Sequence, residues 1–247
     1  MIVREILARA ILSRSRVFEY TVNAYAGCGH GCSYCYARFM KRFSGHKEPW
    51  GQYVDVKINA PDLLQREIAK RKPGNVWISG VCDPYQPLER RYRLTRRCLE
   101  ILIQHNWPIT IQTRSPLVVR DLELLKGYAR LRVGLTITTA DDKIRRIFEP
   151  LAPTIPARVA ALERLHSAGI QTFVMIAPLL PKAEGLASIL PGKTSSVLVD
   201  RLNYRYADWV YKRYHLEDFR TDDYFSRTSR EICSALSNKG LECQSMC

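Results

Sequence analysis

Short apolar runs rich in β-branched residues alternate with longer segments of helical periodicity along most of this chain. The apolar runs predict strands at residues 53–58, 76–81, 109–113, 131–138, 172–177 and 197–200. Elsewhere, apolar residues recur at three- and four-residue spacing and predict helices at 63–71, 95–105, 116–126, 156–168 and 222–236. Gly169, directly after the fourth of these helices, is typical of a helix C-terminus.

Regular alternation of strands and helices predicts parallel strands joined by right-handed crossovers. The expected fold is α/β, a partial (β/α)6 barrel over residues 1–215 with a short helical extension of the same domain at 216–247. The chain has 247 residues, of which 46% are hydrophobic, so it can bury a full core. In such a sheet the functional groups gather where the strands end.

Charge and cysteine usage narrow the partners and the compartment. Lys and Arg outnumber Asp and Glu by 38 to 24, so the net charge is +14. Either a polyanionic partner such as nucleic acid or a plain solvated basic surface fits this charge. No apolar run reaches the roughly 18 residues of a membrane helix. Clustered cysteines, unlike a disulfide framework, favour the cytoplasm. The basic residues are spread over 66–72, 90–97, 145–146 and 201–213.

The most informative motif is a group of three cysteines within eight residues, Cys28, Cys32 and Cys35. The spacing Cys-x3-Cys-x2-Cys presents three thiolates that can hold three corners of a [4Fe-4S] cluster and leave the fourth iron without a protein ligand. The flanking glycines, which let the backbone wrap closely around a cube, are Gly27, Gly29 and Gly31. The alternative is a zinc site, completed by His30 or His46 as the fourth ligand.

This spacing, with the aromatic Tyr34 immediately before Cys35, resembles the signature of the radical S-adenosylmethionine (SAM) superfamily. Two further blocks resemble its spore photoproduct lyase-like branch: ILSRSRVFEYTVNAYAGCGHGCSYCYAR at 11–38, and WISGVCDPYQPLE at 77–89 followed by LTRRCLE at 94–100. The resemblance covers residues 10–215. The chain departs from it at Ala24, where relatives usually carry Pro, and at Cys82, where many carry Thr.

The resemblance implies an enzyme whose [4Fe-4S] cluster binds SAM and cleaves it reductively to a 5′-deoxyadenosyl radical. That radical would abstract a hydrogen atom from a large substrate, for which nucleic acid is the candidate. The reaction needs an electron donor such as ferredoxin or flavodoxin. The alternative is a non-catalytic iron-sulfur protein that binds nucleic acid or senses redox state.

The resemblance also assigns residues to SAM. In relatives, the strand end that matches Ser79 and Gly80 receives the methionine amino group of SAM. Tyr34 would lie near the adenine.

The residue types at two other strand ends add further SAM candidates. Thr136 and Thr138 carry hydroxyls suited to ribose or carboxylate contact, although a Thr-rich strand is also simply a stable strand. Ala177, which precedes Pro178, is small enough to leave room for adenine.

The segment directly after the 76–81 strand carries the candidates for catalysis. Cys82 could donate a hydrogen atom from its thiol to a carbon radical, or fill the place of a buried Thr. Asp83 and Tyr85 lie in a loop stiffened by two prolines, where they could bind substrate or hold the loop itself. Cys98, on the apolar side of a predicted helix, is a core residue.

The C-terminal region holds two further features. Cys233, Cys243 and Cys247 could bind a second iron-sulfur cluster, or Cys233 could belong to the core and the other two be loose thiols. Residues 202–214 interleave aromatic with basic side chains. That composition suits nucleic-acid stacking, and it equally suits an amphipathic helix that packs on the barrel.

Overall fold

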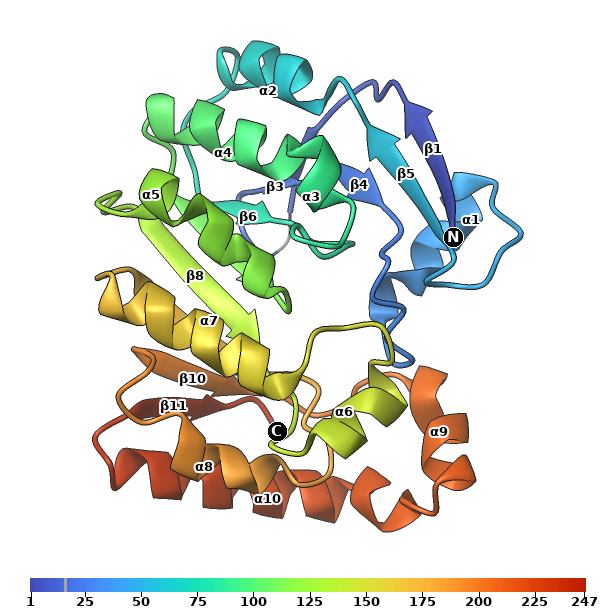
Figure 1. The fold of residues 1–247 in the computed structure, drawn as a ribbon, viewed down its shortest axis with the longest axis vertical. Coiled ribbons are helices and arrows are strands. Elements are labelled where there is room, and N and C mark those ends of the chain that lie inside the picture. The colour runs from blue at the N-terminus through green and yellow to red at the C-terminus, as the bar shows by residue number, and fades with distance from the viewer. Residues whose placement is uncertain (16) are drawn as a thin grey trace. The chain divides into compact units, whose positions relative to one another are not determined.

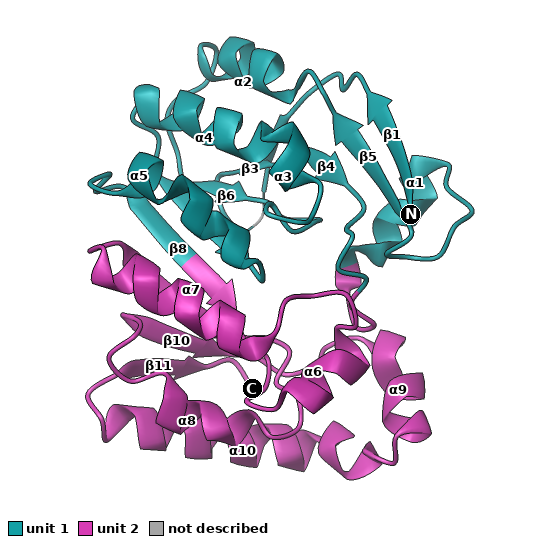
Figure 2. Cartoon of the chain, viewed as in Figure 1, with its two compact units in different colours: residues 1–31, 37–133 teal, residues 32–36, 134–247 magenta. Residues whose placement is uncertain are grey.

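The computed structural model describes residues 1–15 and 17–247; Arg16, in the segment 11–38, lies outside the described residues. The chain divides into two compact units, unit 1 (residues 1–31 and 37–133) and unit 2 (residues 32–36 and 134–247) (Figures 1 and 2). Strand β8 (Leu131–Thr136) begins in unit 1 and ends in unit 2. The division falls within the cysteine motif, so that Cys28 belongs to unit 1 and Cys32 and Cys35 belong to unit 2.

Unit 1 contains two groups of paired strands and the helices that connect them. Its strands are β1 (Ile2–Ile6), β2 (Leu12–Arg14), β3 (Tyr20–Val22), β4 (Tyr25–Ala26), β5 (Tyr53–Lys57), β6 (Val76–Ile78) and β7 (Ile109–Thr113). Its helices are α1 (Lys41–Ser44), α2 (Ala60–Ile68), α3 (Glu89–Tyr92), α4 (Leu94–Gln104) and α5 (Leu122–Leu125). Strands β3, β6 and β7 are parallel neighbours, and β2 adds to β3 antiparallel.

The strand predicted at 53–58 forms, but it lies in a separate small sheet. Strand β5 pairs parallel with β1 and antiparallel with β4, in the order β1-β5-β4. In the sheet that contains β6 and β7, the position expected for this strand is occupied by β3. Its three residues are too few to show periodicity in the sequence. Strand β3 pairs with β6, and the chain then passes through β4 into the cysteine motif.

Unit 2 has strands β9 (Gln171–Ile176), β10 (Ser196–Val199) and β11 (Glu242–Ser245), which pair in parallel in the order β9-β10-β11. Its helices are α6 (Asp142–Phe148), α7 (Ile155–Ser167), α8 (Leu186–Ile189), α9 (Asp208–Arg213) and α10 (Asp222–Ser237). The side chains of Asp141, Thr154 and Thr221 each accept a backbone N–H at a helix start. The C-terminal extension is therefore a helix followed by a strand, and Figure 1 shows α10 beside β11.

Candidate active site

The part of the cysteine motif that surrounds Cys28 is held by the side-chain amide of Gln86. Its Oε1 accepts the backbone N–H of Gly29 at 2.9 Å, and its Nε2 donates to the carbonyl of Gly27 at 3.2 Å. Gln86 is fully buried, so both bonds are shielded from water. One side-chain amide thus hydrogen-bonds to the peptide groups on both sides of Cys28. Sequence reasoning missed Gln86, for which the only signal is its place between Pro84 and Pro87.

The backbone at Gly27 requires glycine. Its φ is +89°, and a Cβ added there would lie 2.4 Å from the carbonyl oxygen of Tyr53. The loop therefore packs against β5 without any side chain in between. Cys28 itself is 7% exposed, and Cys32, further along the motif, is 5% exposed. Buried thiols in a tightly folded loop suit an iron-sulfur cluster, which needs thiolate donors and protection from solvent.

Asp83 connects this same loop to the end of β7. Its Oδ1 accepts from the Thr113 hydroxyl at 2.5 Å and its Oδ2 from the Arg114 backbone N–H at 2.7 Å. His30, between Cys28 and Cys32, lies with its Nε2 3.5 Å from Oδ2 of Asp83. Burial by itself would raise the pKa of Asp83, but His30, Arg114 and Thr113 together lower the pKa to about 2.

This lowered pKa predicts an acid-sensitive contribution to stability. Because the folded-state pKa lies below the unfolded value, the carboxylate stabilises the fold above about pH 4, and this contribution is lost as the pH falls toward 2. Between about pH 6 and about pH 2.5, the free energy of unfolding of Asp83→Asn should fall by about 1 to 2 kcal/mol less than that of the wild type. Urea unfolding of both proteins at the two pH values measures this. An equally steep fall in the variant would contradict the assignment.

The predicted SAM ligand Ser79 is bound to Asn23, which directly follows β3. The Ser79 hydroxyl donates to Oδ1 of Asn23 at 2.7 Å, and the backbone N–H of Val81 donates to the same oxygen at 3.0 Å. Asn23 thereby fixes the strand end that contains Gly80. A hydroxyl has one hydrogen and two lone pairs, so Ser79 keeps acceptor capacity for a ligand.

Cys82 contacts the same group of residues. Its sulfur lies 3.0 Å from the Ser79 hydroxyl oxygen and donates to the carbonyl of Tyr25 at 3.3 Å. Desolvation by the surrounding protein raises the pKa of Cys82 to about 12. The side chain therefore stays a protonated thiol at neutral pH, which is the form that can donate a hydrogen atom.

Tyr85 is fully buried beside Asp121 and Arg120. Burial raises the pKa of its hydroxyl well above the ordinary value, and the neighbouring Asp121 carboxylate raises it further. The Arg120 guanidinium lies 5.9 Å from the centre of the Tyr85 ring. Cys98, in α4, is fully buried, which confirms its prediction as a core residue.

In unit 2, two candidate SAM-binding residues, one from the cysteine motif and one from the segment after β8, donate hydrogen bonds to the same carboxylate. The hydroxyls of Tyr34 and Thr138 both donate to Oε1 of Glu149, the latter at 2.9 Å. Arg158 forms an ion pair with Glu149 and donates to the carbonyl of Thr136 at 3.0 Å. Sequence reasoning assigned Tyr34, Thr136 and Thr138 to SAM and missed Glu149 and Arg158. Ala177, after β9, precedes Pro178 across a cis peptide bond.

The two histidines of the zinc alternative, His30 and His46, both lie beside carboxylates. Nowhere in residues 1–15 and 17–247 do three or more His, Cys, Asp or Glu side chains surround one point where a metal ion could bind. His46 instead faces Asp55 at 2.8 Å and Glu48 at 3.1 Å. In a [4Fe-4S] cluster each thiolate binds a different iron, so a common point is not needed.

The tail cysteines are arranged differently from a cluster site. Cys233 in α10 forms a disulfide with Cys243 in β11. Helix α10 packs against β11, which brings the two sulfurs together across a separation of 10 residues. A sulfur in a disulfide is not a thiolate and does not bind iron. Cys247 is exposed.

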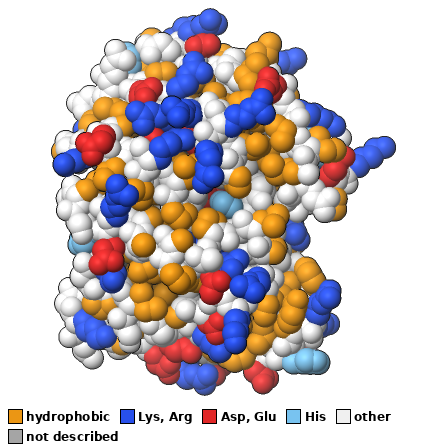
Figure 3. Space-filling view, viewed as in Figure 1, with side chains coloured by type: hydrophobic (Ala, Val, Ile, Leu, Met, Phe, Trp, Pro, Cys, Tyr) orange, Lys and Arg blue, Asp and Glu red, His pale blue; other side chains and the backbone are white. Residues whose placement is uncertain are grey.

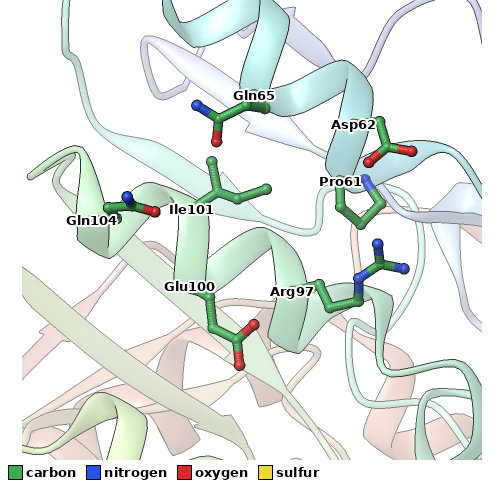
Figure 4. Close-up of a pocket in the computed structure, with 7 residues that line it drawn as sticks. All are labelled: Pro61, Asp62, Gln65, Arg97, Glu100, Ile101 and Gln104. Atoms are coloured by element: carbon green, nitrogen blue, oxygen red, sulfur yellow. The ribbon is translucent and has the colours of Figure 1, made fainter.

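The structure also contains a cavity outside the candidate site. A cavity of about 310 Å³ lies between α2 and α4, with Asp62 and Arg97 in its wall (Figure 4). None of the candidate site residues lines it. Within the described chain, no helix is both long enough and apolar enough to cross a bilayer.

The strands are parallel and connected by helices, and three thiols follow β4. These features define the class of this protein as an α/β protein with a cysteine-rich loop at a strand end. The family model of the radical SAM superfamily matches residues 22–184. The chain belongs to the radical SAM superfamily. Membership implies a [4Fe-4S] cluster and SAM as cofactors.

The chain is also similar to proteins of other organisms. An uncharacterized protein of Methanocaldococcus jannaschii is 37% identical over 163 residues, 66% of this chain and 61% of the relative. An uncharacterized protein of Mycobacterium tuberculosis is 32% identical over 192 residues, 72% of this chain and 56% of the relative. The chain thus spans less than two thirds of the length of either relative.

Among solved structures, spore photoproduct lyase complexed with dinucleoside spore photoproduct has a TM-score of 0.73 at 16% identity, covering 99% of this chain and 82% of the lyase. Streptococcus suis SuiB bound to S-adenosylmethionine has a TM-score of 0.56 at 16% identity, covering 90% of this chain and 45% of SuiB. These similarities show that the fold is the radical SAM partial barrel.

Proposed function

We propose that this protein uses Cys28, Cys32 and Cys35 to bind a [4Fe-4S] cluster, and that it abstracts a hydrogen atom from a large substrate. When bound, the cluster and SAM together supply a 5′-deoxyadenosyl radical. The observation that carries the proposal is the fixed backbone of the cysteine motif. The side-chain amide of Gln86 hydrogen-bonds to the peptide groups around Cys28. The Glu149 carboxylate accepts a hydrogen bond from the hydroxyl of Tyr34, which lies between Cys32 and Cys35.

The test is SAM cleavage by anaerobically reconstituted protein. With dithionite, or with reduced flavodoxin or ferredoxin as the donor, we expect release of 5′-deoxyadenosine. Protein that binds a cluster but releases none would favour the alternative, an iron-sulfur protein that binds nucleic acid or senses redox state. Colourless protein without iron would contradict both.

The hydroxyls of Ser79 and Thr138 already donate within the protein, so we propose that they serve SAM only as acceptors. We also propose that Thr136, Gly80 and Ala177 lie beside the bound SAM. Asp83 has buried protein partners, which favours a role in holding the 83–87 loop over contact with substrate. We assign the reaction to the cytoplasm because the motif cysteines are clustered for metal binding. The Cys233–Cys243 disulfide disfavours a second cluster.

We further propose that Cys82 donates a hydrogen atom to a substrate radical. Support comes from its position four residues past the end of β6 and from its protonated thiol. Cys82→Ala should still release 5′-deoxyadenosine with substrate but lose most of the normal product, because the radical is formed and not quenched. Normal product yield from the variant would rule out this role.

The proposed substrate class is nucleic acid, because unit 2 carries a stack of tyrosines next to the cysteine motif. Tyr36, which follows Cys35, stacks on Tyr204 with ring centres 6.2 Å apart, and Tyr204 stacks on Tyr206 at 5.8 Å. Tyr36 and Tyr204 are 39% and 49% exposed. Exposed aromatic rings beside basic residues such as Arg205 suit base stacking and phosphate contact. Elsewhere, Lys and Arg are scattered over the face in Figure 3.

Binding to labelled single-stranded oligonucleotides tests this surface. We expect the affinity of the wild type to fall with rising salt, and Tyr204→Ala to weaken binding about tenfold because one stacking contact is lost. Phe43→Ala, which removes an aromatic ring that is 75% exposed outside the stack, is the matched control. Equal affinity of the two variants, measured by fluorescence anisotropy with DNA and with RNA, would count against the surface.

A further inference from the structure

A buried ion pair in unit 2 lies outside every motif that sequence reasoning singled out. Glu149 follows the last residue of α6, Arg158 lies in α7, and both side chains are fully buried. The guanidinium of Arg158 also donates to the carbonyls of Thr136 and Pro153, each at 3.0 Å. These three contacts fix the guanidinium, which in turn fixes the Glu149 carboxylate.

This carboxylate reaches the cysteine motif. It accepts the hydroxyl of Tyr34, which is only 5% exposed and lies between Ser33 and Cys35. The backbone adds a second attachment, since the N–H of Ser33 donates to the carbonyl of Phe148 at 2.9 Å. A third bond, from the N–H of Cys35 to the carbonyl of Cys32 at 3.2 Å, closes the turn between these two cysteines.

The turn from Cys32 to Cys35 is thus attached at two consecutive positions, Ser33 and Tyr34, to residues 148–149. Hydrogen bonds to a charged, buried carboxylate are stronger and more directional than neutral ones. We propose that Glu149 and Arg158 are positioning residues that act through Tyr34 to hold the Cys32 and Cys35 sulfurs in the geometry that an iron-sulfur cluster requires. This inference rests on the proposed function, in which the motif cysteines bind the cluster.

Two tyrosine hydroxyl deletions in unit 2 separate this role from plain stability. Tyr34→Phe removes the bond from the cysteine motif to Glu149, and Tyr224→Phe removes the hydroxyl of a buried tyrosine in α10 that donates to the carbonyl of Leu180 at 3.5 Å. After anaerobic reconstitution without SAM, we expect Tyr34→Phe to lose its cluster to a chelator about tenfold faster than the wild type. Its reduced cluster should also show an altered electron paramagnetic resonance (EPR) spectrum. Tyr224→Phe should retain the wild-type rate and spectrum.

A double variant tests the ion pair itself. Glu149→Gln with Arg158→Met removes both charges together, so that neither is left buried without its partner. We expect the same faster cluster loss as in Tyr34→Phe, at a thermal midpoint that shows the protein to be folded. Normal cluster retention and a wild-type EPR spectrum in Tyr34→Phe would overturn the inference while leaving the proposed function intact. Wild-type protein that takes up no iron would instead contradict the proposed function.

Discussion

We expect Cys32→Ala to bind no stable [4Fe-4S] cluster and to release 5′-deoxyadenosine only at background level. Three thiolates are the minimum that holds a cluster with one open iron, and alanine offers no ligand in place of the lost sulfur. The same result is expected for Cys28→Ala and Cys35→Ala. Iron and sulfide content per chain, followed by anaerobic turnover with SAM, measure the effect.

Cys98→Ala is the matched control for that experiment. Cys98 is as buried as a cysteine can be, at 0% exposure in α4, but it lies outside the motif. Its loss should cost about 1 kcal/mol of stability through a small cavity and leave iron content unchanged. If Cys98→Ala lost iron to the same extent as Cys32→Ala, cysteine burial and not ligation would explain both results.

The largest effect on stability is expected at Glu89, at the start of α3. Its fully buried carboxylate accepts the Tyr25 hydroxyl at 2.5 Å and the Arg120 guanidinium at 3.0 Å. It also accepts the backbone N–H groups of Thr95 and Arg96 in the first turn of α4, at 3.0 and 3.2 Å. Glu89→Gln replaces one acceptor oxygen with a donor that faces these donors. We expect a loss of about 3 to 5 kcal/mol in the free energy of unfolding.

Glu100→Gln, in the neighbouring helix α4, provides the comparison. Glu100 pairs with Arg96 at 3.0 Å, but its side chain is 45% exposed, so the pair contributes at most about 0.5 kcal/mol. Chemical denaturation of both variants at neutral pH gives the two values. A Glu89→Gln variant within about 1 kcal/mol of the wild type would show that the carboxylate does not organise this region.

Much of the fold could be predicted from the sequence because its signals are local. Helices α4, α7 and α10 start and end within one residue of the predicted limits, since their apolar periodicity is strong and capping residues stand at the starts of α7 and α10. Helix α6 was missed because its seven residues are too few to show a clear apolar periodicity in the sequence. Arg145, expected at the surface, is only 4% exposed and pairs with Asp142.

The partners of the site residues could not be predicted, because each depends on a residue far away in the chain. Thr138 appeared as a candidate SAM ligand, and only the fold shows that its hydroxyl donates to Glu149. Gln86 hydrogen-bonds to Gly29, which lies 57 residues earlier in the chain. No periodicity or motif in the sequence indicates this contact. Burial also changes the chemistry of residues without changing their identity, as the raised pKa of Cys82 shows.

The sequence by itself determined the chemistry of this protein, because three thiols in eight residues are a local arrangement that a short loop can present to a cluster wherever the rest of the chain lies. The tertiary structure alone decided what holds that loop. Gln86, Glu149 and Arg158 become its supports only when folding removes them from water, since buried polar groups have to find partners inside the protein. A sequence lists such groups but does not say which of them will be buried together.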